Sequence, residues 1–227
     1  MEPSALAGGI AFLLGYAVGA LPVAWLAVRR RHGVDMRTHG LGGTGAINAA
    51  AVGGWRTAAL AVLLEVVKGA VVGLGARLYS STGWFVAAAI AGCVMGDAFP
   101  IVLRRGGRGV VPLVAGLAVA LPLAGLVTAL TAIPAAVFTS FRGHIFDAVV
   151  LIAVPAGLLL GTRQWQSLVP AAVIVLALLA RAEIRRRRRD AVRLRAAGGR
   201  ILLDPDIAGG PAPVSPRASQ NPWPWDS

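Results

Sequence analysis

Long apolar stretches follow one another through residues 4–183 of this chain of 227 residues. Apolar residues make up 56% of the sequence and charged residues 14%, whereas a soluble domain carries about a quarter charged residues. Several of the stretches approach or exceed the roughly 20 residues that a helix needs to cross about 30 Å of hydrocarbon. The alternating segments of about ten residues that build membrane β-barrels are absent. The sequence therefore predicts an all-α polytopic membrane protein.

The apolar stretches predict seven transmembrane helices, over residues 4–28, 56–77, 84–103, 110–122, 124–138, 145–161 and 167–183. The positive-inside rule places Arg29, Arg30, Arg31 and the arginine-rich segment 181–190 in the cytoplasm. Residues 110–138 must then cross an even number of times, which predicts two short helices. One long helix is the alternative, and it would export the arginine cluster or make the sixth span re-entrant. The predicted topology has the N-terminus outside and the C-terminus inside.

The chain is predicted to consist of a transmembrane domain, residues 1–190, and a basic, then Pro/Gly-rich disordered tail, residues 191–227. Across the boundary between domain and tail, residues 185–197 have the composition of an amphipathic basic helix at the membrane surface. The first span lacks a preceding basic segment, which argues against a cleavable signal peptide. The basic residues that give the chain its net charge of +12 lie between the apolar stretches. This placement favours a role in membrane topology and contact with anionic lipid over nucleic-acid binding.

A polar, glycine-rich stretch interrupts the apolar pattern at residues 35–48, DMRTHGLGGTGAIN. Glycine permits positive φ values, so several backbone N–H groups can turn toward one anion. Arg37 and His39 stand beside the glycines, and Asn48 closes the stretch. Four glycines lie within six residues, at Gly40, Gly42, Gly43 and Gly45. The stretch predicts an anion-binding loop, most simply for a phosphate.

Three further charged residues lie inside or at the edge of apolar stretches. Glu65 and Lys68 are three residues apart, so they share one helix face, and their charges predict that this face points into the bundle. The pair is functional, structural or part of a transport pathway. Asp97, before a Phe-Pro pair, is either a helix cap or a catalytic carboxylate. A second basic glycine-rich loop, RRGGRG at 104–109, follows on the same predicted side.

These groups of residues resemble the motifs of the PlsY-type acyl-phosphate:glycerol-3-phosphate acyltransferases of bacterial membranes. Residues 19–22 and 35–48 resemble the first motif, G-S-I-P followed by D-I-R-x-x-G-S-G-N-x-G-A-T-N. Residues 65–69, EVVKG, resemble the second, D-x-x-K-G. Residues 96–100, GDAFP, and 106–109, GGRG, resemble the third, G-H-x-F-P followed by G-G-K-G. The order and spacing agree over residues 15–110, and the later spans agree in layout.

The resemblance implies seven transmembrane helices and an active site at the cytoplasmic face of the bacterial inner membrane. It implies the transfer of a fatty acyl group from acyl phosphate to glycerol 3-phosphate, which gives lysophosphatidic acid and inorganic phosphate and begins phospholipid synthesis. The implied partners are these two substrates and membrane lipid, with no nucleic acid, no cofactor and no metal.

The resemblance also implies roles for individual residues. Asp97 and Lys68 are the implied catalytic residues, with Asp97 as base or orienter. Cationic side chains and loop N–H groups bind phosphate and stabilise developing charge. The implied phosphate-binding residues are Arg37, Gly40, Gly42, Gly43, Thr44, Gly45, Asn48, Lys68 and Arg108. The implied remaining pocket residues are Glu65, Gly107 and Glu183.

The chain departs from the family pattern at several positions. Neutral side chains of the first motif are replaced by Ala20, Leu41, Gly43 and Ile47, and the histidine of the third motif is replaced by Asp97. Near the C-terminus, residues 180–187, ARAEIRRR, are the nearest match to H-R-E-N-I-x-R-L, with Glu183 in place of the asparagine. Hydroxyl and amide groups orient substrates, so their loss lowers rates. Two alternatives are therefore kept: an impaired family member that binds lipid phosphate or acyl phosphate, and a small membrane transporter.

Overall fold

The computed structural model of the chain describes residues 3–39, 43–101, 106–139 and 144–196. Every regular element in these ranges is helical, which confirms the predicted all-α fold. The elements are α1 (Ala5–Gly19), α2 (Val23–His32), α3 (Ala46–Tyr79), α4 (Gly83–Ala98), α5 (Val110–Ala120), α6 (Pro122–Thr139), α7 (His144–Thr162), the 3₁₀ turn η1 (Trp165–Ser167) and α8 (Leu168–Ala196).

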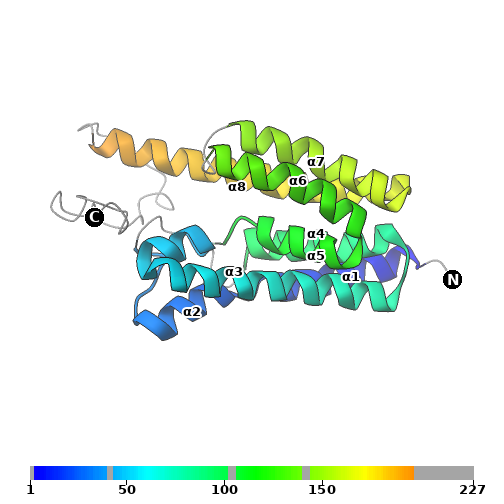
Figure 1. Ribbon diagram of the computed structural model, residues 1–227, viewed down its shortest axis with the longest axis horizontal. Helices are drawn as coiled ribbons and strands as arrows, with labels where there is room; N and C mark the ends of the chain where they lie inside the picture. The colour runs from blue at the N-terminus through cyan, green and yellow to red at the C-terminus, as the bar shows by residue number, and fades with distance from the viewer. Residues whose placement is uncertain (1–2, 40–42, 102–105, 140–143, 197–227) are drawn as a thin grey trace.

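The helices run along the long axis of the molecule, with α6, α7 and α8 on one side and α1, α3, α4 and α5 on the other (Figure 1). Helix α4 is central, because it contacts α1, α3, α5, α7 and α8, and nearly all of its residues are buried. The core therefore forms around one helix, and the residue at the end of that helix, Asp97, lies inside the bundle.

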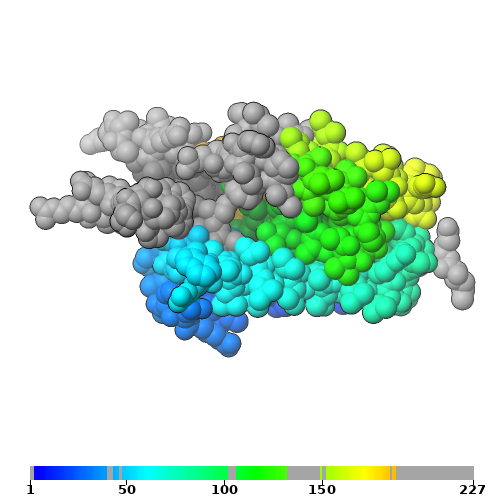
Figure 2. Space-filling view, viewed as in Figure 1, coloured from blue at the N-terminus to red at the C-terminus, as the bar shows by residue number. Residues whose placement is uncertain are grey.

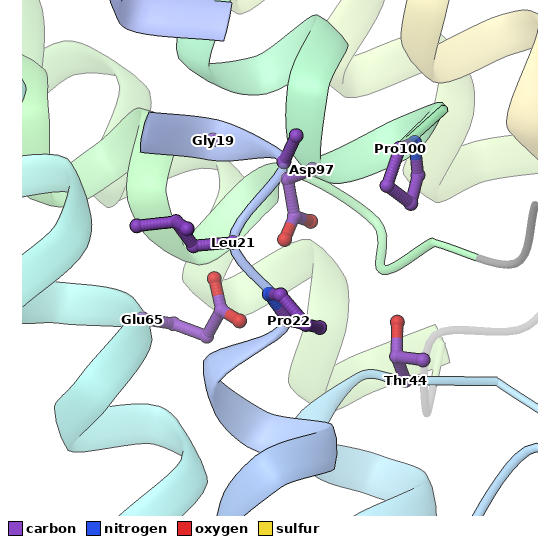
Figure 3. Close-up of a pocket in the computed structure, with 8 residues that line it drawn as sticks. Gly19, Leu21, Pro22, Thr44, Glu65, Asp97 and Pro100 are labelled. Atoms are coloured by element: carbon purple, nitrogen blue, oxygen red, sulfur yellow. The ribbon is translucent and has the colours of Figure 1, made fainter. Parts of the chain in front are cut away.

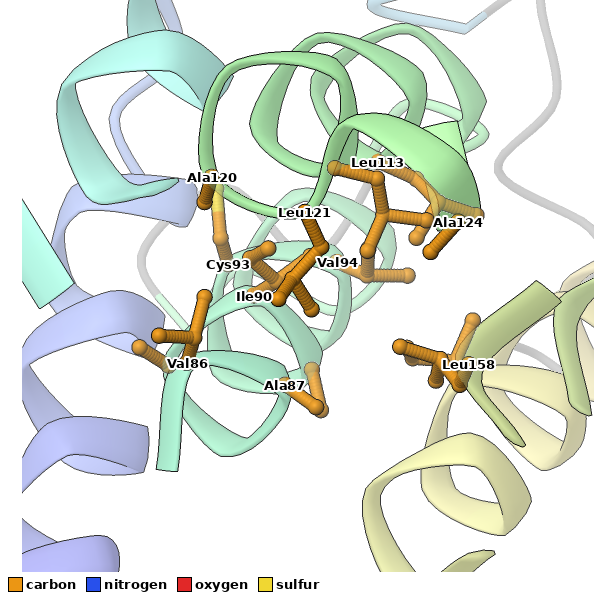
Figure 4. Close-up of a cluster of buried hydrophobic side chains, with 14 of the residues drawn as sticks. Val86, Ala87, Ile90, Cys93, Val94, Leu113, Ala120, Leu121, Ala124 and Leu158 are labelled. Carbon is orange, nitrogen blue, oxygen red and sulfur yellow. The ribbon is translucent and has the colours of Figure 1, made fainter. Parts of the chain in front are cut away.

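One stripe of α4 supplies the centre of the core, since Val86, Ile90 and Val94 recur every four residues and are fully buried. They belong to one cluster with Leu113 of α5 and Leu158 of α7 (Figure 4). In a membrane the lipid tails are as apolar as leucine, so these contacts stabilise the bundle through packing rather than through removal from water.

The outward-facing side chains are apolar as well. Along α3, Leu63, Val67 and Val71 are each at least half exposed and lie on one face of the helix. Helix α3 extends along one edge of the molecule in the space-filling view, below α5 and α6 (Figure 2). This combination of an apolar core and an apolar exterior is that of a helix bundle surrounded by hydrocarbon.

Helices α1 and α4 pack with their backbones in contact. A Cβ atom added at Gly15 would collide with the carbonyl oxygen of Ala89, and one added at Gly19 would collide with that of Cys93. The spacing of Gly15 and Gly19 predicts such a close approach, and the structure confirms it. The approach brings the end of α1 against the end of α4 that carries Asp97.

Seven apolar helical segments are found in the part of the chain that the structure describes. Three are long enough to cross a membrane: Ala5–His32, Asn48–Tyr79 and Trp165–Ile184. Four are shorter: Gly83–Ala98, Val110–Ala120, Pro122–Thr131 and Ile152–Thr162. The prediction of about seven transmembrane helices is confirmed, and so are two short helices over 110–138, which meet at Leu121. The orientation of the bundle in the membrane stays a prediction.

Helix boundaries differ from the prediction in the first half of the chain. The span predicted over 4–28 is broken, because α1 ends at Gly19 and α2 begins at Val23. Pro22 lies in the break, where its missing N–H cannot continue a helix. Helix α3 begins at Ala46, ten residues before the predicted span 56–77, and is kinked at Gly54, whose φ is 72°.

Two further helix ends, those of α8 and α4, differ from the prediction. Helix α8 runs without interruption from Leu168 to Ala196, so residues 185–196, within the surface helix predicted over 185–197, continue the last transmembrane helix. Helix α4 ends at Ala98, and the span predicted over 84–103 was too long by several residues. Residues 197–227 of the predicted tail lie outside the described residues, and the domain boundary after residue 190 stays a prediction.

Candidate active site

The break between α1 and α2 forms one wall of a polar pocket. The pocket has an empty volume of about 210 Å³, including its open mouth, and is lined by Gly19, Ala20, Leu21, Pro22, Thr44, Glu65, Asp97 and Pro100 (Figure 3). Ending α1 at Gly19 leaves carbonyl groups without helical partners. One of them, the carbonyl oxygen of Gly19, accepts a hydrogen bond of 3.2 Å from Lys68 Nζ.

Lys68 joins two carboxylates in the interior beside this pocket. Its Nζ lies 2.6 Å from Glu65 Oε2 and 2.6 Å from Asp97 Oδ1, and the three side chains are between 2% and 9% exposed. Lys68 Nζ donates hydrogen bonds to Asp97 Oδ1 and to the Gly19 carbonyl oxygen, and the Glu65 carboxylate lies within ion-pair distance. The structure therefore confirms that the Glu65–Lys68 face points into the bundle.

Asp97 also organises the second glycine-rich loop. Its Oδ2 accepts a hydrogen bond of 2.8 Å from the Gly109 N–H, and its carbonyl oxygen accepts one of 2.9 Å from the Gly107 N–H. Gly109 has φ 74°, which favours glycine. The side chain and the backbone of Asp97 thus fix residues 107–109, and with them Arg108, at the start of α5.

The first glycine-rich loop is held by an ion pair near its start. Arg37 Nη2 lies 2.6 Å from Asp35 Oδ2, and the Arg37 Nε donates to both carboxylate oxygens. Trp25 Nε1 donates to Asp35 Oδ1 over 2.9 Å, and the Arg37 guanidinium lies 5.2 Å from the Trp25 ring. The hydrogen bonds from Arg37 hold the pKa of Asp35 well below its ordinary value. In turn, hydrogen bonding to the Asp35 carboxylate raises the pKa of Arg37. These side chains are about a quarter exposed.

Asn48 closes this loop from within. Its Nδ2 donates to the carbonyl oxygens of Met36 and Gly43 over 2.6 and 2.7 Å, and to that of His39 over 3.2 Å. The side-chain nitrogen is therefore turned toward the loop's own carbonyl groups. Gly45 has φ −89°, so the positive φ considered for these glycines is not adopted at this position.

Of the other loop residues predicted to bind phosphate, the structure describes Gly43 and Thr44. Thr44 is buried and lines the pocket. Gly43 is half-buried. Gly40 and Gly42 lie outside the described residues, so their predicted phosphate contacts stay predictions.

Arg181 is a site neighbour whose placement the sequence reasoning missed. Arg181 is 8% exposed, and its guanidinium donates to the carbonyl oxygens of Gly106 and Gly107 and lies 5.5 Å from the Phe99 ring. Tyr16 Oη donates to the Phe99 carbonyl oxygen over 2.7 Å from the other side. Arg181 follows an apolar stretch and therefore counts as a topology signal. Its place in the C-terminal motif was the available sign of a site role.

Glu183, by contrast, faces outward. Its side chain is 50% exposed, and its Oε1 accepts from Arg187 Nε over 2.8 Å on the same helix. The structure thus brings together Glu65, Lys68, Asp97, Gly107 and Arg108, while Glu183 lies apart from them. Among the residues that the structure describes, no group of three or more His, Cys, Asp or Glu side chains has the arrangement of a metal site.

Comparison with known proteins gives a consistent result. The sequence profile of the family described as glycerol-3-phosphate acyltransferase matches residues 9–197. A glycerol-3-phosphate acyltransferase of Myxococcus xanthus is 38% identical over 120 residues, which is 52% of this chain and 62% of that protein. One of Halalkalibacterium halodurans is 30% identical over 161 residues, which is 70% of this chain and 77% of that protein. The match to the Myxococcus relative thus covers less than two thirds of its length.

The fold also matches a solved structure. The crystal structure of PlsY, an integral membrane glycerol 3-phosphate acyltransferase in its glycerol 3-phosphate form, aligns with a TM-score of 0.63 and 19% sequence identity. The alignment covers 87% of this chain and 96% of PlsY. At this identity the match establishes the shared fold of an integral membrane protein.

Proposed function

The chain belongs to the glycerol-3-phosphate acyltransferase family, and on this premise we propose that it transfers a fatty acyl group from acyl phosphate to glycerol 3-phosphate. A hydroxyl oxygen of glycerol 3-phosphate forms a bond to the acyl carbon, and the bond from that carbon to the phosphate oxygen breaks. The hydroxyl proton leaves with the phosphate, so the products are lysophosphatidic acid and inorganic phosphate. The family match over residues 9–197 carries this proposal.

The geometry supports a division of roles between the cations. Arg37 and Arg108 belong to the two glycine-rich loops and are only partly buried, so we assign them to the substrate phosphates, with neighbouring loop N–H groups. Lys68 is surrounded by internal acceptors. We assign it to holding the cluster and to stabilising charge on the departing phosphate through its field.

Asp97 is assigned the orienting role rather than that of a general base. Its Oδ1 accepts from Lys68 and its Oδ2 accepts from the Gly109 N–H. A base must lie within hydrogen-bonding reach of the proton that it takes, and here both oxygens already hold donors that fix the loop. Thr44 and Glu65 complete the lining of the pocket.

The proposed location is the bacterial inner membrane, with the pocket at the cytoplasmic face and the N-terminus outside. Arg29, Arg30 and Arg31 form the last turn of α2, and further arginines follow the apolar part of α8. In Figure 1, α2 and the end of α8 lie at the same end of the molecule, opposite the N-terminus. This distribution supports the proposed orientation through the positive-inside rule.

One observation favours a second candidate, an impaired member that binds lipid phosphate or acyl phosphate without turnover. The Asp97 carboxylate lies against the Lys68 ammonium and the Gly109 N–H, which are two kinds of donor that bind phosphate. The Asp97 carboxylate therefore occupies donors that would otherwise be available to a substrate phosphate.

An assay of the purified full chain in liposomes separates the two candidates. Acyl phosphate and glycerol 3-phosphate are supplied, and lysophosphatidic acid and phosphate are measured for the wild type and Arg108→Gln. The proposal predicts equal amounts of both products, and a rate reduced by about 10- to 100-fold in the variant, because a charge-assisted hydrogen bond is lost. Calorimetric binding of acyl phosphate without product supports the second candidate, and neither binding nor product contradicts both.

A further inference from the structure

We propose that Arg181 is a positioning residue of this site, and that it acts through the loop that carries Arg108. This inference rests on the proposed function for its consequence in catalysis. Arg181 lies on α8, more than seventy residues along the chain from the glycines that it contacts.

The burial of Arg181 must be compensated by its neighbours. A guanidinium is charged at all accessible pH values, and Arg181 is only 8% exposed. Burying a charge is unfavourable unless hydrogen bonds and nearby groups compensate. Arg181 meets the carbonyl oxygens of Gly106 and Gly107 and the face of Phe99. Two neighbouring carbonyl groups suit the planar fork of arginine, which presents several N–H groups in fixed directions.

The carbonyl groups that Arg181 contacts belong to the loop that carries Arg108. The peptide after Gly106 has its N–H, on Gly107, bonded to the Asp97 carbonyl oxygen. Two residues later, the Gly109 N–H is bonded to Asp97 Oδ2. Arg181 therefore holds the loop from the carbonyl side, while Asp97 holds it from the N–H side. Arg108 lies between the two anchored glycines, so its backbone is fixed by both.

Side chains from separate helices converge on residues 97–107. Tyr16 of α1 donates to the Phe99 carbonyl oxygen, and Lys68 of α3 binds the Asp97 carboxylate. Arg181 adds α8 to this arrangement. Residues 180–187, which resemble the C-terminal motif of the family, therefore contribute to the site through Arg181, even though Glu183 faces outward.

Amide hydrogen exchange in the full chain in lipid tests the positioning role without any turnover. Arg181→Gln is compared with Arg187→Gln, a control on the same helix whose side chain is 71% exposed. Exchange at the amides of Gly107 and Gly109 should be faster by about tenfold or more in Arg181→Gln, because local opening is easier. Equal exchange in the two variants overturns the proposal. Arg181→Lys should give an intermediate rate, since it keeps the charge without the fork.

Kinetics test the route through Arg108. In a wild type that forms lysophosphatidic acid, Arg181→Gln should lower kcat/KM by about 10- to 100-fold, because a displaced binding group loses its alignment. In an Arg108→Gln background the same substitution should cost less than about twofold further. Independent, multiplicative losses overturn the proposal. An inactive wild type contradicts the proposed function alone, because the exchange measurement still decides the role of Arg181.

Discussion

Two cations of the predicted site, Lys68 and Arg37, hold a carboxylate at the same distance in different surroundings. Lys68 Nζ lies 2.6 Å from Asp97 with side chains that are 2% and 9% exposed, and Arg37 Nη2 lies 2.6 Å from Asp35 with side chains that are 27% and 24% exposed. An exposed ion pair contributes about 0–1 kcal/mol, whereas separating a buried pair costs about 3–5 kcal/mol. Burial, rather than distance, decides which cation can exchange its partner for a substrate phosphate.

This difference assigns the two regions separate tasks. The buried cluster of Glu65, Lys68 and Asp97 holds α1, α3, α4 and the start of α5 together. The partly exposed pair of Asp35 and Arg37 can open at small cost, so Arg37 is the cation that we expect to move onto a phosphate. The predictions below test this division, beginning with the largest expected effect.

Replacing the buried cation should be the most damaging change. Lys68→Met leaves Glu65 and Asp97 as two buried carboxylates without their shared ammonium. The free energy of unfolding should fall by about 3–5 kcal/mol, measured by denaturant titration in mixed micelles. Adding Glu65→Gln to this variant should recover part of the loss, because one uncompensated charge is removed. A loss below about 1 kcal/mol would mean that the cluster behaves like a surface pair.

Replacing one oxygen of Asp97 should have a smaller effect. In Asp97→Asn the side-chain carbonyl still accepts from Lys68, but the NH₂ group then faces the Gly109 N–H, donor against donor. We expect a loss of about 1–3 kcal/mol in the free energy of unfolding, with faster amide exchange at Gly109. Unchanged exchange at Gly109 would show that Asp97 does not hold the loop.

Arg37→Gln should separate binding from stability. The free energy of unfolding should change by less than about 1 kcal/mol, because the pair with Asp35 is partly exposed. The KM for glycerol 3-phosphate should rise by about 10- to 100-fold, because a charge-assisted hydrogen bond of about 1.5–3 kcal/mol is lost. A large fall in stability with an unchanged KM would reverse the roles given to the two regions.

The smallest expected effect is the pH dependence of the Asp35–Arg37 pair. The pKa of Asp35 is lowered in the folded protein, chiefly by the hydrogen bond from Arg37. Its stabilisation is therefore complete above the unfolded pKa of about 3.9 and is lost as the pH falls toward the folded value. The difference in unfolding temperature between the wild type and Asp35→Asn should be constant between about pH 5 and 7 and shrink below about pH 4. A difference that grows in acid would contradict the pairing.

The sequence predicts the helical layout well wherever apolar length alone decides it. Two short helices over 110–138 follow from parity and match α5 and α6 closely. Helix ends set by tertiary contacts are less predictable. Pro22 signals a weak point within the first span, yet the chain breaks fully there because Lys68 supplies a partner for the freed Gly19 carbonyl group.

The site shows the same limit. The spacing of Glu65 and Lys68 and their position in an apolar stretch predict that they face inward, and the family pattern indicates Asp97 as a neighbour. The contact among the three needs the packing of α3 against α4, and the added partner, the Gly19 carbonyl group, needs the close approach of α1 to α4 at Gly15 and Gly19. Arg181 was missed because an arginine beyond an apolar stretch has the same sequence appearance whether it faces solvent or a loop carbonyl.

The most direct test of the division between the two regions is calorimetric binding of glycerol 3-phosphate to the wild type, Asp35→Asn and Asp97→Asn in lipid. Asp35→Asn removes the carboxylate charge that competes for Arg37 and keeps an oxygen for Trp25, so its affinity should be about two- to fivefold higher, equivalent to an exposed pair of up to about 1 kcal/mol. Asp97→Asn should bind no more tightly than the wild type, because Lys68 stays with its internal partners. Tighter binding by Asp97→Asn, with Asp35→Asn unchanged, would identify Lys68 as the exchanging cation and contradict this account.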